Sequence, residues 1–181
     1  MTARVSLPDA SNAPAGSTAA LAQIQAAFGT TPQMFRAVAN SPAALQSMWG
    51  AFGALGGGVI PAQLGEKIAV AVADRNRCEY CLAAHTALGR KAGATAEEMA
   101  AAQAGRAEDP RTAAALTFAL KLVNDRGQAS DADVAQLRAV GFGDEEIVEI
   151  VAHVALNLFT NYINVALNVP VDFPGVKLNP R

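Results

Sequence analysis

The sequence predicts a single all-α domain. Alanine, which loses the least free energy on entering a helix, supplies 41 of the 181 residues. Apolar residues recur at helical spacing, and capping residues, prolines and glycines divide the chain into segments of helical length. Alternating β-branched patterns, the mark of strands, are nearly absent. We therefore expect about seven or eight helices in one domain over residues 1–181.

The first three predicted helices are recognised by their ends. Each begins after a capping residue or a proline and stops at a glycine or a polar turn. They span residues 18–28, 43–55 and 63–75.

Five further helices are expected in the second half of the chain. Thr95 and Glu98 have the spacing of a capping box, and Asp144 is expected to cap the last and longest helix. The five span residues 78–91, 96–103, 110–124, 131–140 and 144–167. The tail, residues 169–181, carries three prolines and is not expected to be helical throughout.

Composition excludes several classes of protein. The net charge is −2 with dispersed basic residues, whereas a nucleic-acid binder usually carries a basic face. A hydrophobic fraction of 51% excludes global disorder. Polar residues interrupt the most apolar segment, 147–167, and residues 1–16 lack a secretory pattern, so neither a membrane span nor a signal peptide is expected. We expect a cytoplasmic protein.

The most specific chemical feature is the segment that holds the only two cysteines, Cys78 and Cys81. A disulfide between residues so close would stabilise the fold little, which favours a chemical role. In a helix, Cys81 also lies one turn from His85, on the same face. An imidazole can take the proton of a thiol, and a helix N-terminus stabilises the thiolate, which is the nucleophile. The helix end favours Cys78 as the nucleophile, whereas His85 favours Cys81.

Three other interpretations of this segment compete. The cysteines and His85 could be packing residues of an apolar helix. They could bind zinc, although the only other candidate ligand of the same kind is His153, which we interpret as a histidine between helices. A thioredoxin-like site is the third, but that motif requires strands.

The pattern Glu66, eleven residues, Cys78-x-x-Cys81-x-x-x-His85 resembles the alkylhydroperoxidase D-like branch of the carboxymuconolactone decarboxylase superfamily. Segments 31–36 and 157–164 also look like that branch, and the resemblance covers roughly residues 32–174. It implies an all-helical fold that assembles as a homotrimer or homohexamer and reduces hydroperoxides.

The resemblance also implies a role for each residue of the pattern. Cys81 would attack the peroxide and pass through a sulfenic acid, and Cys78 would donate a proton and resolve that acid as a disulfide. His85 and Glu66 would form a proton relay, completed by a water. Only the resemblance places Glu66 beside the thiols. The sequence departs from the best-known member of the branch at Tyr80, where that member has a second histidine.

The remaining candidate residues are left with two interpretations each. The asparagines of the last helix could line the site or a subunit interface, and three large side chains of the second helix are expected in the core or at an interface. These residues are Asn157, Asn161 and Asn164, and Met48, Trp49 and Phe52.

The function expected from the whole sequence is a thiol-dependent hydroperoxide reductase of the peroxiredoxin type. Its substrate would be a hydroperoxide and its reductant a dithiol or a protein, with no cofactor, metal, nucleic acid or membrane. The alternatives are a thiol–disulfide exchange protein that serves a partner, and a non-catalytic helical oligomer with structural cysteines.

Overall fold

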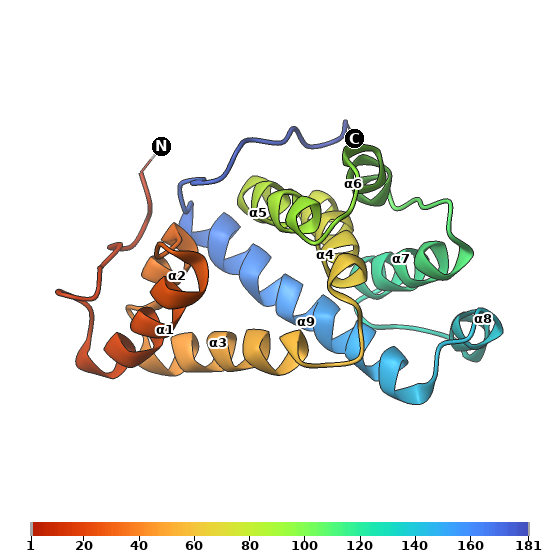
Figure 1. The fold of residues 1–181 in the computed structure, drawn as a ribbon, viewed down its shortest axis with the longest axis horizontal. Coiled ribbons are helices and arrows are strands. Elements are labelled where there is room, and N and C mark those ends of the chain that lie inside the picture. Colours follow the sequence, from red (N-terminus) through yellow and green to blue (C-terminus); the bar gives the residue numbers. More distant parts are fainter. Residues whose placement is uncertain (1, 181) are drawn as a thin grey trace.

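Nine α-helices and one 3₁₀ turn make up the computed structural model, which describes residues 2–180 (Figure 1). No strand occurs within that range. The elements are η1 Ala15–Ser17, α1 Thr18–Phe28, α2 Gln33–Val38, α3 Pro42–Gly56, α4 Ala62–Arg75, α5 Glu79–Lys91, α6 Ala96–Gln103, α7 Pro110–Asn124, α8 Asp131–Ala139 and α9 Asp144–Leu167.

All eight helices predicted from the sequence are present, and the all-α class is confirmed. The count of seven or eight was too low because α2 was not predicted. This helix has only six residues, which is less than two full turns, so its apolar residues cannot establish a helical period. Burial of Met34, Phe35 and Val38 against the core stabilises it instead.

Capping chemistry fixes several helix boundaries. The predicted capping box of α6 is present, with Thr95 and Glu98 each bonded to the other's backbone N–H. The prediction for α9 was wrong by one residue, because Gly143 is the cap and Asp144 is the first helical residue. The Glu146 carboxylate accepts the Gly143 N–H at 2.9 Å, while Asp144 accepts a hydrogen bond from the Arg138 guanidinium.

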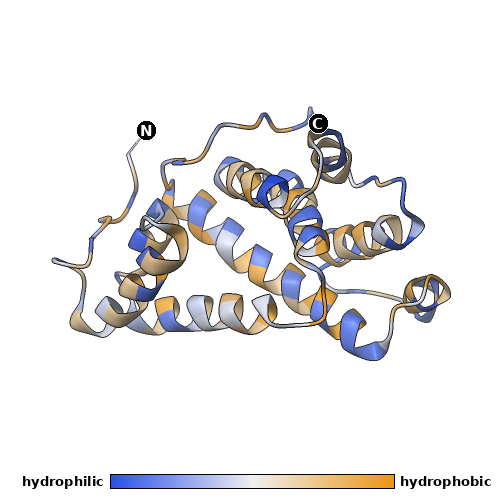
Figure 2. Ribbon diagram, in the orientation of Figure 1, coloured by the Kyte–Doolittle hydropathy of each residue, from blue (hydrophilic) through white to orange (hydrophobic). Residues whose placement is uncertain are grey.

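Two helices organise the core. Helix α4 contacts α5, α6, α7 and α9, and eight of its residues are buried. Helix α9 runs diagonally through the molecule and also contacts α2, α3, α5 and α7 (Figure 1). Hydrophobic and hydrophilic bands alternate along both helices, as expected for helices that each direct a face at their neighbours (Figure 2).

The end of the chain crosses the outside of the helices without forming a helix of its own (Figure 1). We call residues 169–180 the C-terminal strap. Its Asp172 carboxylate accepts the Gln33 N–H at 2.7 Å, and the Asn179 N–H donates to Asp74 at 2.9 Å. The first bond holds the strap to the start of α2, and the second holds it to the end of α4.

Candidate active site

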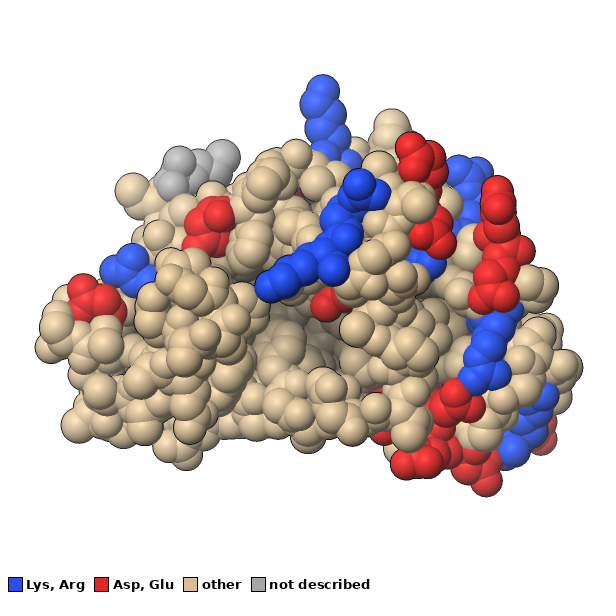
Figure 3. Space-filling view, viewed as in Figure 1, with Lys and Arg blue, Asp and Glu red and all other residues tan. Residues whose placement is uncertain are grey.

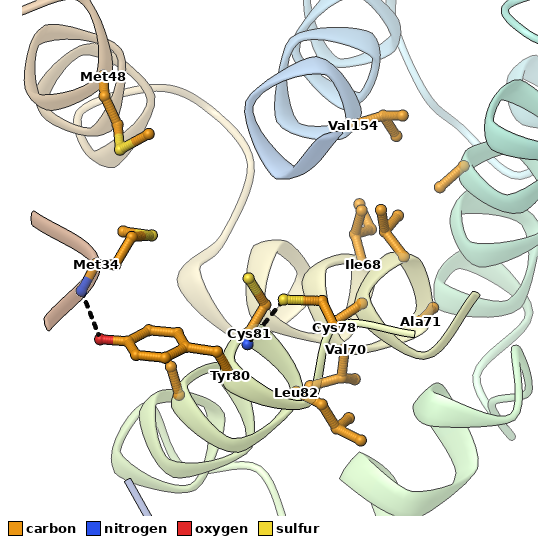
Figure 4. Packing of buried hydrophobic residues seen from close by; sticks show 14 of the residues in the cluster. Met34, Met48, Ile68, Val70, Ala71, Cys78, Tyr80, Cys81, Leu82 and Val154 are labelled. Carbon is orange, nitrogen blue, oxygen red and sulfur yellow. Dashed lines mark hydrogen bonds between the residues drawn. The ribbon is translucent and has the colours of Figure 1, made fainter. Parts of the chain in front are cut away.

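The cysteine segment lies at a sharp turn between α4 and α5. Arg77 adopts a left-handed conformation, with φ of 58°, which turns the chain back on itself. Cys78 then caps α5, rather than lying inside it as the sequence predicted. Its Sγ accepts the backbone N–H of Cys81 at 3.2 Å (Figure 4). The thiols still meet, because a cap side chain folds over the third residue of its helix.

Both cysteines are free thiols and are buried, with 1% and 2% of their surface exposed. Helix α9 covers Cys81: Asn164 Nδ2 donates to its Sγ at 3.1 Å, and Thr160 Oγ1 lies 3.9 Å from it. Of the two locations that the sequence left open for the asparagines, the structure places Asn164 in the site. Asn161 accepts a hydrogen bond from Asn76, at the turn between α4 and α5.

Glu66 lies at the site, on α4. Its Oε2 is 2.7 Å from Nδ1 of His85, which extends from α5 one turn after Cys81. The two side chains are 23% and 12% exposed. The close packing of α4 on α5 therefore joins all four residues of the sequence pattern into one cluster: two thiols in contact and a carboxylate bonded to an imidazole.

The surroundings of the two thiols differ electrostatically. Burial alone raises the pKa of Cys81, but the Cys78 thiol, the His85 cation and the Asn164 amide stabilise its thiolate and lower that pKa to about 6. The pKa of Cys78 moves the opposite way, because its thiol donates to the Cys81 thiolate and is itself buried. These shifts favour ionisation at Cys81 and a retained proton on Cys78.

His85 and Tyr80 have distinct charge states. Burial lowers the pKa of His85, but the charge and the hydrogen bond of Glu66, together with the charge of Cys81, raise it by a larger total amount, so the net shift favours the imidazolium. Burial raises the pKa of Tyr80, which remains a neutral phenol. The Tyr80 oxygen accepts the Met34 N–H at 3.2 Å (Figure 4), so this residue fixes α5 to α2 and supplies no charge.

Two hollows reach the cluster from different sides, and the surface is hollowed at its centre between α3 and α5 (Figure 3). A pocket of about 160 Å³ reaches Glu66 and His85, and also His153 of α9. A smaller, mostly apolar pocket of about 40 Å³ reaches Cys81 and the other side of His85. His85 and Phe52 line both, so they form the wall between the two pockets. The larger one is also mostly apolar but holds Glu66, His153 and Asn157, and we call it the polar pocket.

His153 lies between helices, as predicted, but on the wall of the polar pocket. Its ring packs on Gly65, where a Cβ would lie 3.2 Å from its Cε1, so a side chain there would force the ring to shift by a few tenths of an ångström. Within residues 2–180 its buried Nε2 has no hydrogen-bond partner. Burial lowers its pKa, which keeps the ring neutral beside the Glu66–His85 pair.

The zinc interpretation finds no support in the geometry. Within residues 2–180, no three side chains of His, Cys, Asp or Glu are grouped as ligands of a metal ion. The thioredoxin-like interpretation fails because the same residues contain no strand.

The large residues of α3 lie in the core or at its edge. Met48 is fully buried. Trp49 and Phe52 are half-buried and pack edge-on against Phe35, with ring centroids 5.7 and 5.8 Å apart.

Replacing Asn164 by leucine is expected to raise the pKa of Cys81 by roughly one to two units. The change keeps the size of the side chain but removes a hydrogen bond to a charged sulfur, which typically stabilises by about 1.5–3 kcal/mol. The pH midpoint of Cys81 alkylation, followed by mass spectrometry, measures the shift. Asn124→Leu, at the exposed end of α7, is the control; an unchanged midpoint in Asn164→Leu would show that the amide does not stabilise the thiolate.

Comparison with known proteins finds a family match that covers this site. Residues 42–125, which include all four clustered residues, match the carboxymuconolactone decarboxylase family. A peroxidase-related protein from Silicibacter sp. TM1040 is similar in structure, with 25% identity, a TM-score of 0.80 and coverage of 93% of this chain and 91% of that chain. No curated protein matches the chain significantly.

Two further solved structures are similar to the chain. A peroxidase-related protein with an alkylhydroperoxidase AhpD core, from Ralstonia eutropha JMP134, has 25% identity, a TM-score of 0.83 and coverage of 94% and 92%. The debrominase Bmp8, solved in complex with 2,3,4-tribromopyrrole, has 19% identity, a TM-score of 0.78 and coverage of 95% and 93%, and shares the fold. The family match and the two peroxidase-related structures support the resemblance of the chain to the alkylhydroperoxidase D-like branch of the carboxymuconolactone decarboxylase superfamily.

Proposed function

We propose that this protein reduces hydroperoxides through the Cys78–Cys81 pair. The observation that carries the proposal is the environment of Cys81, a buried thiol held as a thiolate by the Cys78 thiol, the His85 cation and the Asn164 amide. A low pKa together with an adjacent resolving thiol is the arrangement expected of a peroxide-reactive cysteine. Similarity to two peroxidase-related structures agrees with it.

The reaction has three balanced steps. The Cys81 thiolate attacks the outer oxygen of R–OOH; the O–O bond breaks, the alkoxide takes a proton and leaves as R–OH, and Cys81 becomes a sulfenic acid. The Cys78 thiol then attacks that sulfur, forming the disulfide and releasing water. A dithiol reductant finally transfers two electrons and two protons to the disulfide, which regenerates both thiols and leaves the reductant as its own disulfide.

The Glu66–His85 pair supplies the proton for the first step. The Glu66 carboxylate favours the positively charged form of His85, which lies between the polar pocket and Cys81 and is bonded through Nδ1 to Glu66 at 2.7 Å. The bond to Glu66 orients the ring and stabilises its charge, as the carboxylate partner of a catalytic histidine does elsewhere. The polar pocket can return the proton from solvent.

The experiment that tests the proposal measures cumene hydroperoxide consumption with dithiothreitol as the dithiol. We expect one dithiothreitol oxidised for each hydroperoxide reduced. Disulfide exchange without peroxide consumption would instead support the exchange-protein alternative. Thiols that react with neither reagent in the folded protein would support the structural one.

We also propose that the protein self-associates as a trimer or hexamer through α9. Its outer face presents an apolar stripe at alternating spacings of three and four residues, as in helices that pair along their length. The stripe consists of Val148, Val151, Ala155, Leu158, Tyr162 and Val165. Val148 and Tyr162 are 67% and 62% exposed, and after Glu149 the helix has no acidic or basic residue except His153.

A second copy of the chain explains this stripe better than a bilayer does. By length and composition alone α9 could cross a membrane. However, its opposite face contacts five other helices and carries four buried polar residues. These four are Asn157, Thr160, Asn161 and Asn164. The same helix thus holds Cys81 on one side and is available for a subunit on the other.

Replacing Val151 by lysine is expected to reduce the oligomer to smaller species, because a charge would be buried at a helix–helix contact. Light scattering of the purified protein measures the mass. Val59→Lys is the matched control, since Val59 is equally exposed, at 43% against 42%, but lies before α4. A wild-type monomer, or an oligomer unaffected by Val151→Lys, would contradict self-association through α9.

A further inference from the structure

The apolar pocket at Cys81 is walled by aromatic rings from five separate parts of the chain. Phe28 and Phe35 come from α1 and α2, Phe52 from α3 and Tyr80 from α5, and Phe173 comes from the C-terminal strap. Phe35 links two of these rings, with centroid distances of 5.8 Å to both Phe28 and Phe52. The walls therefore consist of two groups of contacting rings, one around Phe35 and one formed by Tyr80 and Phe173.

The chemistry of this pocket selects against charge. No Lys, Arg, Asp or Glu lines it. Its polar groups are the Cys81 thiol, the His85 imidazole and the Tyr80 hydroxyl, and the last is already occupied by the Met34 N–H. A ligand here would place its reacting oxygen near Cys81 and His85 and surround its remaining atoms with hydrocarbon, which favours an uncharged apolar body.

Phe173 forms the wall that belongs to no helix. Its ring packs edge-on against Tyr80, with centroids 5.7 Å apart. The preceding residue, Asp172, accepts the Gln33 N–H at 2.7 Å, which fixes the strap beside the pocket. The space is small, about 40 Å³. A ligand with a larger body must gain space at one of these rings, and Phe173 is the one ring that no helix carries.

We propose that this aromatic pocket binds the apolar body of an organic hydroperoxide, and that Phe173 limits the size of the body that reaches Cys81. The inference rests on the proposed peroxide chemistry, which it extends by naming a specificity-determining residue. Compact, uncharged hydroperoxides are the substrates that the pocket admits, and bulky ones are disfavoured by the Phe173 ring.

The test compares kcat/KM for cumene hydroperoxide with kcat/KM for hydrogen peroxide. Phe173→Ala is expected to raise the ratio about tenfold, and Phe173→Trp to lower it about tenfold, since gain or loss of apolar fit in a pocket changes rates by factors of this order. Phe173→Leu, which keeps an apolar contact in the strap, should change the ratio in the same direction as alanine. Leu178→Ala, a half-buried apolar residue of the strap outside the pocket, should leave it unchanged. The proposal would be overturned if the ratio of the two kcat/KM values were the same in the Phe173 variants as in the wild type, or if it fell in both Phe173→Ala and Phe173→Trp.

A second measurement separates this inference from the proposed function. N-Methylmaleimide and N-phenylmaleimide alkylate Cys81 without any peroxide, and the ratio of their rates reports the size limit. Phe173→Ala should raise the relative rate of the phenyl reagent, and Phe173→Trp should lower it. If the wild type reduces no hydroperoxide but the maleimide ratios change as expected, the peroxide function fails and the size limit holds. If the ratio of the two alkylation rates is the same in the Phe173 variants as in the wild type, the size limit is overturned.

Discussion

Serine in place of Cys81 is expected to lower hydroperoxide turnover by at least about 10³-fold, since the loss of a nucleophile removes the reacting atom itself. The serine hydroxyl is not ionised at neutral pH, and the interactions that stabilise the thiolate cannot activate it to the same extent. Initial rates of cumene hydroperoxide consumption, with dithiothreitol as reductant, measure the loss. The small change in size leaves the packing against α9 intact, so the variant should keep the wild-type melting temperature.

Cys78→Ser is the informative companion to this variant. Serine can still cap α5, because its hydroxyl accepts the Cys81 N–H as the thiol does. The first step then proceeds without the second, so one equivalent of peroxide is consumed and Cys81 is left as a sulfenic acid that dimedone traps. Continued turnover in the protein that lacks both thiols would refute the mechanism.

Glu66→Gln is expected to have the next largest effect. Loss of the carboxylate lowers the pKa of His85, which removes the cation that stabilises the Cys81 thiolate. If the pKa of Cys81 returned from about 6 to the ordinary thiol value near 8.5, the thiolate fraction at pH 7 would fall about thirtyfold. The rate of the first step, from stopped-flow mixing with peroxide, should fall by up to that factor.

The pH profile distinguishes this effect from a loss of structure. A lowered pKa means that the thiolate is present above it, so the wild-type rate should rise with pH through about 6 and then level off. It should fall again at higher pH, as His85 loses its proton. In Glu66→Gln the rising part should move to higher pH. Glu97→Gln removes an exposed carboxylate of α6 and is the control; a Glu66→Gln profile that coincides with the wild type would exclude the relay.

Local chemistry explains why most of the fold could be predicted from the sequence. Helix α7 begins at a proline after an aspartate cap, and α6 has a reciprocal capping box, so their ends are set by a few adjacent residues. Helix α2 could not be predicted in this way, because tertiary burial of Met34 and Phe35 stabilises it. The strap is likewise fixed by residues that are distant in the sequence, so no local pattern predicts where it lies.

The residues of the site also differ in whether local sequence or tertiary packing determines their position. The spacing of Cys78, Cys81 and His85 predicts their proximity, because one short segment contains all three. The position of Glu66 depends on how α4 packs on α5, and only the family resemblance indicated it. Asn164 and Thr160 carry a weaker signal, as polar residues one turn apart in the part of α9 that has no acidic or basic residue except His153. Phe173 is brought to Cys81 by the path of the strap alone.

The most direct test of the account is the pH dependence of iodoacetamide alkylation, resolved for Cys78 and Cys81 separately by mass spectrometry. The account predicts that Cys81 reacts with a midpoint near pH 6, that Cys78 reacts only at much higher pH, and that Glu66→Gln moves the first midpoint upward. The mechanism would be contradicted if both thiols titrated near the ordinary value of about 8.5 and neither midpoint changed in Glu66→Gln.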